Sequence, residues 1–401
     1  MINTLPTVFA LIDKTHPIQK AYEKNNAQIR LVGGCVRDAL LGKIAKDIDL
    51  ATPLLPEDGM KLLKSEGIRC IPTGIQHGTF TALLNHEAYE ITTLRQDLIT
   101  DGRHAQVAFS NDWEIDAARR DLTINALYAD FNGVIYDYFE GMKDLQQGII
   151  RFIGNAEARI KEDYLRILRL FRFHAWYGKH PLDVQTLKVC QQLADQLSHL
   201  SKERVTKEIF RLLEAKNPLA SLSQMATHQI LPSLFQNNAL SHITNLIIWE
   251  ERLQLPINPL RRLLILTNNY TLFRLSKAHA FYLKKQTDLM RINMFDDVQR
   301  RYFLSIETKE TIRDTLLLKY CQDVQETQIH ERDLQAIIKE IDYLQTPAFP
   351  VNGTHLIHIG IRGAKIGALL NQCRWWWAEN EYHPSTKMCI EWVLHHHNIK
   401  I

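Results

Sequence analysis

Cysteine is scarce in this sequence and follows no ligand pattern. Six cysteines are spread over 401 residues, and no two of them form a CxxC pair. Disulfide frameworks and zinc sites depend on closer and more regular cysteine spacing, so neither is expected here. The lack of both favours a reducing compartment.

Long hydrophobic runs are also missing. No apolar stretch approaches the roughly 18 residues that are needed to cross a bilayer. The first twenty residues contain neither a basic n-region nor a long apolar core, which are the two marks of a secretory signal. We therefore expect a cytoplasmic protein without a membrane partner.

The chain has no large excess of either charge. Its formal net charge is +3, with 45% hydrophobic and 23% charged residues, as in ordinary globular proteins. The mild positive excess is compatible with a polyanionic partner but does not demonstrate one. The length allows two to four domains of about 100–200 residues each.

The first 150 residues mix strand-like and helix-like segments. The strand-like ones are rich in β-branched residues and read IRLVGG, DIDLAT, GTFTALLN and YEITTLR. A break between Asn85 and Tyr89 indicates two neighbouring strands of one sheet. After about Ala156, apolar residues recur every three to four positions, as in amphipathic helices such as RIKEDYLRILRLFRFHAWYG. The predicted fold class is α+β, with a small mixed α/β head followed by an extended all-α body.

The change of pattern and two prolines suggest four domains. Pro347 and Pro350 mark a boundary near the end of the chain. We predict a head over 1–155, a helical neck over 156–220, a helical body over 221–346 and a helical tail over 347–401.

The strongest local pattern is LVGGCVRDALLGKIAKDIDLAT. A strand runs into Gly33 and Gly34 and then into a helix, and such a turn lets the backbone approach a phosphate closely. Asp47 and Asp49 follow two positions apart, so in a strand both carboxylates face the same side. Paired carboxylates suit Mg²⁺, which binds one or two of them together with substrate phosphates. Asp47 and Asp49 are thus the predicted metal ligands and catalytic residues.

Glu90 is a candidate for a third catalytic carboxylate. It lies in the strand-like segment YEITTLR, which can neighbour the strand of the aspartates. A solvent-facing strand residue is an equally good interpretation.

Further landmarks follow these two motifs in a recognisable order. GGCVRD at 33–38 and DIDLAT at 47–52 are followed by RRDLTINA at 119–126, EDYLR at 162–166 and SKERVTKE at 201–208. The series resembles the motifs of class II tRNA nucleotidyltransferases and bacterial poly(A) polymerases. These enzymes belong to the DNA polymerase beta-like nucleotidyltransferase superfamily.

The resemblance implies an enzyme that adds or repairs the 3′-terminal CCA of tRNA. It would use CTP and ATP without a nucleic-acid template, with two Mg²⁺ ions at the active site and the tRNA 3′ end as partner. The head would be catalytic, the neck would recognise the nucleotide, and the body and tail would bind tRNA. No stable protein partner is implied.

Three alternatives stay open. Bacterial poly(A) polymerases share these motifs, but they tend to carry Asp-Pro where this chain has Glu162 and Asp163. A partial enzyme could add only CC or only A. A catalytically silent RNA-binding protein is the last alternative, but it would have no use for the mutually repelling carboxylates of Asp47 and Asp49.

Several landmark residues suit nucleotide binding. Arginines offer guanidinium donors for phosphates, while Asp121 and Asn125 can address a ribose hydroxyl. Arginines at three-residue steps from Arg166 stay broadly on one side of the predicted helix, where they can clamp a triphosphate. Simple pairing of these arginines with Glu162 and Asp163 is the alternative. The candidate nucleotide-binding residues are Gly33, Gly34, Arg37, Arg119, Arg120, Asp121, Asn125, Asp163, Arg166, Arg169 and Arg172.

Asp163 and Arg166 are also candidates for a protein template. One helical turn would place an acceptor beside a fork of donors. Cytosine and adenine both present an amine donor beside a ring-nitrogen acceptor, whereas uracil and guanine present the reverse order. The alternative is a salt bridge between the two residues that never contacts the base.

The polar segment 96–110 resembles the flexible loop of family members that finish with an adenosine. Its centre is Gly102. The alternative is a mobile surface connection.

A basic stretch lies in the predicted body. Between Arg252 and Arg301, ten Lys or Arg residues stand against three Asp residues. Such an excess is typical of a surface that contacts a phosphate backbone, although a solvated helix face can show it too. The candidate RNA-binding residues are Arg261, Arg262, Lys284 and Lys285.

Overall fold

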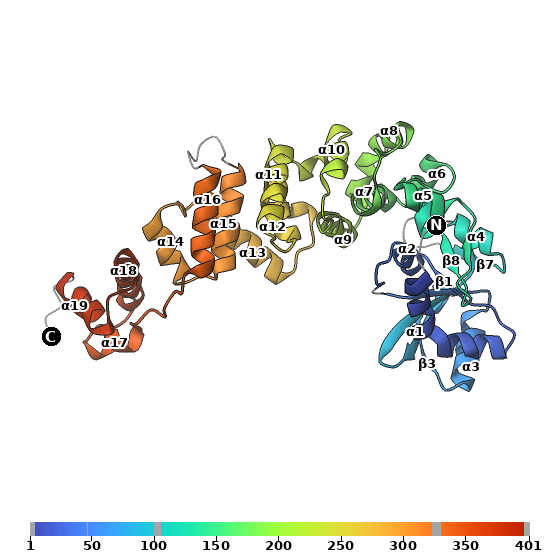
Figure 1. The fold of residues 1–401 in the computed structure, drawn as a ribbon, viewed down its shortest axis with the longest axis horizontal. Helices are drawn as coiled ribbons and strands as arrows, with labels where there is room; N and C mark the ends of the chain where they lie inside the picture. The colour runs from blue at the N-terminus through green and yellow to red at the C-terminus, as the bar shows by residue number, and fades with distance from the viewer. Residues whose placement is uncertain (1–4, 46, 100–105, 323–329, 397–401) are drawn as a thin grey trace. The chain divides into compact units, whose positions relative to one another are not determined.

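The protein was analysed as a computed structural model, which describes residues 5–45, 47–99, 106–322 and 330–396. The chain forms two compact units, Met1–Ser233 and Leu234–Ile401. All described strands lie in the first unit, in the blue-to-green part of the chain in Figure 1. Beyond the last strand, the described elements are all helices. The observed class is α+β, as predicted.

A seven-stranded mixed sheet forms the head. Its strand order is β3-β4-β5-β2-β1-β8-β9, and a separate ribbon pairs β6 with β7. Only β2 and β5 pair in parallel; the other neighbours are antiparallel. The strands are β1 (Arg30–Val32), β2 (Asp49–Thr52), β3 (Arg69–Gly74), β4 (Thr79–Leu84), β5 (Glu87–Thr93), β6 (Arg95–Ile99), β7 (Gln106–Phe109), β8 (Leu127–Ala129) and β9 (Ile135–Asp137).

Strands β4 and β5 form a tight hairpin, which confirms the predicted pair of neighbouring strands. Asn85 and His86 form the turn, and both have positive φ, 51° and 65°. Two consecutive left-handed residues match the twist of the flanking strands. The hairpin fixes the position of β5, which β2 then joins from the other side.

Ten α-helices belong to the described part of the first unit. They are α1 (Leu5–Lys24), α2 (Gly34–Leu40), α3 (Pro56–Ser65), α4 (Trp113–Ala118), α5 (Gly141–Gln147), α6 (Ala156–Glu162), α7 (Leu165–Tyr177), α8 (Val184–Gln192), α9 (Lys202–Leu213) and α10 (Leu219–Thr227). The described residues of both units also form short 3₁₀ helices, which are η1 (Ile75–His77), η2 (Thr123–Asn125), η3 (Ala194–His199), η4 (Pro232–Leu234) and η5 (Tyr270–Leu272).

Helices cover both faces of the head sheet. On one face, α3 approaches so closely that a Cβ on Gly59 would lie 2.9 Å from Phe80 and 3.0 Å from the Tyr22 hydroxyl. On the other face, Trp113 of α4 packs in one core cluster with Tyr128 of β8. Burial of these apolar faces excludes water from the sheet and stabilises it.

The helix predicted through RIKEDYLRILRLFRFHAWYG is broken, which corrects the prediction. Helix α6 ends at Glu162, and Asp163 is extended, with φ −159° and ψ 107°. The Asp163 carboxylate accepts the N–H of Leu165 at 3.1 Å, at the start of α7. An Asp side chain that bonds the backbone two residues ahead competes with a continuous helix.

Three side-chain contacts, two of them buried, hold α7 in place. The Nε of Arg172 lies 2.6 Å from a carboxylate oxygen of Glu208 on α9. His174 hydrogen-bonds Ser221 of α10 at 2.7 Å. The Tyr177 hydroxyl donates to Asp38 of α2 at 2.9 Å, which fastens α7 to the head.

The second unit is helical throughout its described part. Its helices are α11 (Ala239–Arg252), α12 (Pro259–Leu266), α13 (Lys277–Leu289), α14 (Asp297–Leu304), α15 (Lys309–Gln322), α16 (Glu331–Tyr343), α17 (Gly353–His358), α18 (Lys365–Glu379) and α19 (Thr386–His396). Trp377 of α18 is buried in the core of the last three helices, while Trp375 is 39% exposed.

Candidate active site

The two predicted metal ligands lie at the start of β2. The strand begins at Asp49, and Asp47 directly precedes it. Ile48 and Leu50 are buried, whereas both aspartates are exposed, so the two-residue alternation extends through the segment. The strand therefore directs Asp47 and Asp49 to one side, opposite to Ile48 and Leu50.

Glu90 lies next to Asp49 in the sheet. The parallel register of β2 and β5 pairs these two residues directly. Asp49 has exposed surface, but its carboxyl lies in the cavity wall, and this partial burial, followed by the negative charges of Glu90 and Asp47, raises its pKa to about 6, although Arg120 acts in the opposite direction. A cation that binds among these carboxylates offsets their mutual repulsion and favours the ionised form of Asp49.

The glycine turn needs a glycine at its first position. Gly33 has φ 74°, and a Cβ there would lie 3.3 Å from a guanidinium nitrogen of Arg120. Its N–H donates to the carbonyl of Leu127 at 2.9 Å. The N–H of Gly33 is therefore already bonded to β8. The predicted contact between Gly33 and a phosphate depends only on the close approach that a residue without a side chain allows.

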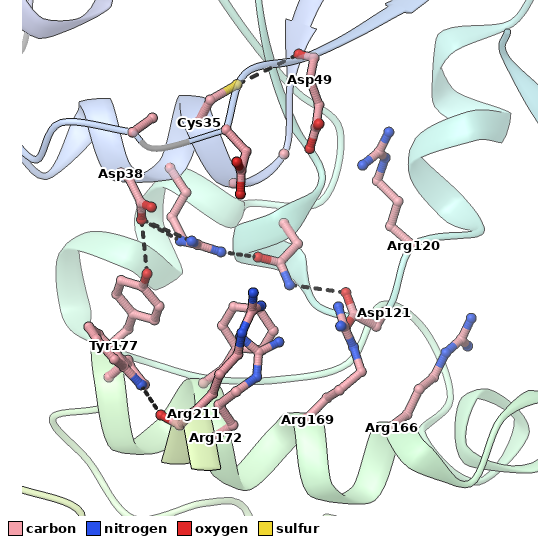
Figure 2. A pocket seen from close by; sticks show the side chains of 18 of the residues that line it. Cys35, Asp38, Asp49, Arg120, Asp121, Arg166, Arg169, Arg172, Tyr177 and Arg211 are labelled. Carbon is pink, nitrogen blue, oxygen red and sulfur yellow. Dashed lines mark hydrogen bonds and ion pairs between the residues drawn. The ribbon is translucent and has the colours of Figure 1, made fainter. Parts of the chain in front are cut away.

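Figure 2 shows a chain of hydrogen bonds that leads from Asp38 to Asp121 across the site, and the buried Arg37 belongs to this chain. It donates to Asp38 at 3.0 and 2.9 Å and to the side-chain oxygen of Asn125 at 2.5 Å. Asn125 in turn donates to Asp121 at 3.0 Å, and Asp121 binds Arg169 of α7 at 2.5 Å. Four predicted nucleotide-binding residues thus form one connected network.

The network holds Asp121 ionised. Burial alone would raise the pKa of this carboxyl, but Arg169 and the amide of Asn125 outweigh it and lower the pKa to about 2. Asp121 therefore accepts hydrogen bonds at every physiological pH.

Arg119 and Arg120 share one acidic partner that sequence reasoning missed. Asp116 binds Arg119 at 2.8 Å and Arg120 at 3.2 Å, and it also accepts from the Tyr128 hydroxyl at 2.6 Å. Asp116 is 1% exposed. Its spacing of three and four residues from the arginines was the available signal, because such pairs meet on a helix.

Each arginine of the predicted stripe on α7 has an acidic partner. Arg166 pairs with Glu162, as one of the sequence alternatives foresaw. Arg169 pairs with Asp121 and Arg172 with Glu208, which come from distant segments. The stripe therefore presents arginines whose positions are fixed by ion pairs.

The side chains of Asp163 and Arg166 do not pair with each other, although the backbone N–H of Arg166 donates to the carbonyl of Asp163 at 3.0 Å. The Asp163 carboxylate binds Arg204 of α9 at 2.5 Å, while Arg166 binds Glu162. One turn does join the two residues, but Asp163 is extended and lies outside α7, so the expected pairing of their side chains is wrong. The proposed salt bridge between them is also absent among the described residues. Both side chains nevertheless line the same cavity.

That cavity is open to one side, has a volume of about 870 Å³ and is lined by head and neck residues. Figure 2 shows Asp49 and Arg120 on one side of it and the arginines of α7 facing them. All predicted metal-binding and nucleotide-binding residues line it, and Glu90 lines a smaller cavity that shares Asp49. The structure therefore brings together the head and neck candidates.

Other cavity residues were not predicted. Tyr177 lies under Arg37 and Lys43, with 4.4 and 4.9 Å from its ring centroid to the cations. Arg204 and Arg211 line the wall formed by α9. Arg204 belongs to the landmark SKERVTKE and could have been found there, whereas the position of Tyr177 depends on the packing of α7.

Segment 96–110 is only partly a loop. Its described flanks belong to β6 and β7, which pair with each other. Residues 100–105, including Gly102, lie outside the described residues.

Two of the four predicted RNA-binding residues are buried, which corrects that prediction. Arg261 and Arg262 are each 1% exposed. Arg261 binds Glu250 at 2.8 Å and Asp314 at 2.7 Å, and Arg262 binds Glu250 at 2.7 Å. Charged residues can occupy a helical core when they are paired in this way, so a local excess of basic residues does not identify a surface.

The two lysines lie at or near the surface of α13. Lys284 is exposed, whereas Lys285 is half-buried and forms an ion pair with Glu307. Lys284 therefore remains the best of the four RNA-binding candidates.

The donor set near β2 fits a divalent metal only together with a substrate. No group of three or more His, Cys, Asp or Glu residues in the described parts of the chain can hold a metal ion by itself. Asp47 and Asp49 offer hard oxygen ligands, and Mg²⁺ completes such a site with water and substrate phosphates.

Two family models match separate segments of the chain between residues 29 and 239. The poly A polymerase head domain matches residues 29–151. The probable RNA and SrmB-binding site of polymerase A matches residues 181–239. The first match contains the glycine turn, the aspartate pair and the RRDLTINA landmark.

Known relatives match over nearly the whole chain. CCA tRNA nucleotidyltransferase 1, mitochondrial, from Mus musculus is 35% identical over 397 residues, which cover 94% of this chain and 88% of the relative. The Homo sapiens protein of the same name is 35% identical over 395 residues with the same coverage. The Bacillus stearothermophilus CCA-adding enzyme in complex with CTP has the same fold, with a TM-score of 0.70, 23% identity and coverage of 99% and 98% of the two chains.

The comparisons leave the compartment open. Among the described helices, none combines the length and the apolarity needed to cross a membrane. The two mammalian relatives are named as mitochondrial proteins, so the cytoplasmic location remains a prediction.

The resemblance drawn from the motifs is therefore confirmed by likeness along the chain. The full-length relatives are nucleotidyltransferases, and the landmarks on which the resemblance rests lie around one cavity. This chain belongs to the CCA tRNA nucleotidyltransferase family.

Proposed function

We propose that this protein builds or repairs the 3′-terminal CCA of tRNA from CTP and ATP. The observation that carries the proposal is the junction of Asp47 and Asp49 with the large arginine-lined cavity. A triphosphate needs both cationic neighbours and carboxylates that can hold a metal, and this cavity offers them side by side.

Asp47 and Asp49 are the proposed ligands of the divalent metal that membership of the family implies. Two Mg²⁺ ions held there would lower the pKa of the attacking 3′-hydroxyl and neutralise the leaving pyrophosphate. Glu90 is proposed as a third catalytic carboxylate because its backbone is paired with that of Asp49. No protein nucleophile is required.

The neck residues are proposed to bind and orient the nucleotide. Asp121 and Asn125 are held rigidly in the network of Arg37 and Arg169, which supports a role in positioning the ribose. Arg120 lies near Asp49, and this position supports a role for its guanidinium beside the α-phosphate. Asp163 and Arg166 are proposed to read the base, after exchanging their present partners for it.

The alternatives differ in the product that they make. A poly(A) polymerase would extend an RNA end with many adenosines, and nothing in the comparisons favours it over CCA addition. A partial enzyme would stop after CC or would add only A. We also retain the proposed division into head, neck, body and tail, with tRNA contacts in the last two.

A test is to offer tRNA transcripts that lack CCA, CA or A to the purified protein, with CTP, ATP or both. Sequencing of the product ends should show completion to CCA on all three transcripts. Long adenosine tails, or addition of only one kind of nucleotide, would reject the proposal in favour of one of the alternatives.

A further inference from the structure

A second cavity adjoins the large one at Asp49. It has a volume of about 220 Å³ and shares Asp49 with the large cavity. Thr79, Glu90 and Thr92 line it from β4 and β5, and Arg119 and Arg120 also border it. Binding sites for whole small ligands usually measure about 300–1,000 Å³, so this cavity suits a fragment such as a sugar.

Nucleotidyl transfer needs a binding place for the RNA end beside the reacting phosphate. The reaction forms a bond from the RNA 3′-oxygen to the α-phosphorus and breaks the bond from that phosphorus to the β-phosphate oxygen. Pyrophosphate leaves, and the hydroxyl proton passes to water. The attacking and leaving oxygens lie roughly in line on opposite sides of the phosphorus. With the triphosphate in the large cavity, the RNA end must approach the α-phosphorus from another direction, and the second cavity offers a place for it beside Asp49.

The two threonines have the chemistry to recognise a ribose. Thr79 and Thr92 are paired across β4 and β5, and their hydroxyl oxygens are 3.1 Å apart. One hydroxyl donates to the other, which leaves one hydrogen and several lone pairs of the pair available. A ribose 2′-hydroxyl is both a donor and an acceptor, and it is the group that distinguishes RNA from DNA.

We propose that Thr79 and Thr92 bind the 2′-hydroxyl of the terminal ribose of the RNA and so position its 3′-hydroxyl beside Asp49. The inference rests on the proposed function and extends it to the primer end. Thr92 lies two residues after Glu90 on β5, so both side chains face the same side of the sheet. The threonine pair is thus directed toward the side where the carboxylates lie.

A similar pair on the neighbouring strands provides a matched control. The hydroxyl oxygens of Thr73 and Thr81 are 2.9 Å apart across β3 and β4. This second pair does not line the small cavity. A Thr→Val change in either pair should therefore affect the stability of the sheet. Only a change of Thr79 or Thr92 should also weaken ribose recognition.

The test compares single-turnover addition of CMP to tRNA primers that end in a ribonucleotide or in its 2′-deoxy analogue. We expect the native protein to prefer the ribose end, and Thr92→Val or Thr79→Val to reduce that preference by about three- to tenfold, the effect of one hydrogen bond. The KM for CTP should stay the same. Thr73→Val should keep the native preference.

Equal slowing of both primers by Thr92→Val and Thr79→Val, with the preference intact, would overturn the inference and leave a structural role only. If the native protein extends neither of the two primers, the proposed function is overturned instead. The two failures are therefore distinguishable in one experiment.

Discussion

Glu90 of β5 and Asp49 of β2 occupy directly paired positions in parallel strands. Their proximity, added to burial, raises the pKa of Asp49 to about 6. A metal ligand must be deprotonated, so the proton and the metal compete for this carboxylate. The pairing of the two residues therefore links metal binding to pH.

The first prediction is a loss of metal affinity in weak acid. Because the folded pKa of Asp49 is raised, its proton is held until the pH rises through about 6. The apparent affinity for Mg²⁺ should be constant above that pH and should fall by about tenfold per unit below it. Mg²⁺ titrations of nucleotide addition between pH 5 and 8 would measure this.

Glu90→Gln supplies the control for that prediction. Removal of the neighbouring negative charge should lower the pKa of Asp49 and move the midpoint below 6. An unchanged midpoint would show that Glu90 does not govern the titration. Because the raised pKa means that folding favours protonated Asp49, the contribution of Asp49 to the stability of the metal-free protein should fall as the pH rises from 4 to 6.

The second prediction concerns base selection by Asp163. Asp163→Ala should raise the incorporation of UTP and GTP relative to CTP and ATP, because a mispaired buried polar group costs about 1–3 kcal/mol. Asp163 also accepts the N–H of Leu165 and binds Arg204. Competition assays with all four nucleotides would measure the ratio.

Asp163→Asn separates base selection from helix capping. The asparagine keeps an oxygen for the Leu165 N–H but places a donor beside the base. Slower addition by both variants, with the original ratio between nucleotides, would leave Asp163 with a structural role alone.

The third prediction is that Arg261→Gln destabilises the protein without a specific effect on RNA. The change leaves Glu250 and Asp314 in the core without their shared partner. Removal of one partner from a buried ion pair lowers the free energy of unfolding by about 3–5 kcal/mol. Denaturant or thermal unfolding would detect this loss.

Lys284→Gln is the matched change on the surface. It should leave the unfolding transition in place and reduce the salt dependence of tRNA binding, because one phosphate contact is lost. A native salt slope in this variant would place the RNA-binding surface elsewhere.

The local patterns of the sequence predicted the head well. Alternation around Ile48 indicated that Asp47 and Asp49 face one side, and the break after Asn85 indicated the hairpin. Both signals lie within a few residues, where the period of a strand governs side-chain direction. The family motifs then supplied the rest of the cavity lining.

Long-range partners were beyond such reasoning. Asp121 is 48 residues from Arg169, and Asp314 is 53 residues from Arg261. No periodicity connects such positions, so buried arginines of the second unit looked like a basic surface. The break at Asp163 was missed because one side-chain hydrogen bond outweighed a helical pattern on both sides of it.

The most direct test of the account is nucleotide addition by Asp47→Ala and Asp49→Ala on tRNA lacking CCA, with CTP, ATP and Mg²⁺ present. Each variant should lose addition almost completely while its tRNA affinity and unfolding temperature stay near native values, because both carboxylates line the cavity and the loss of Asp49 also removes its repulsion with Glu90. Turnover above a few per cent of native in either variant would contradict the assignment of the metal site.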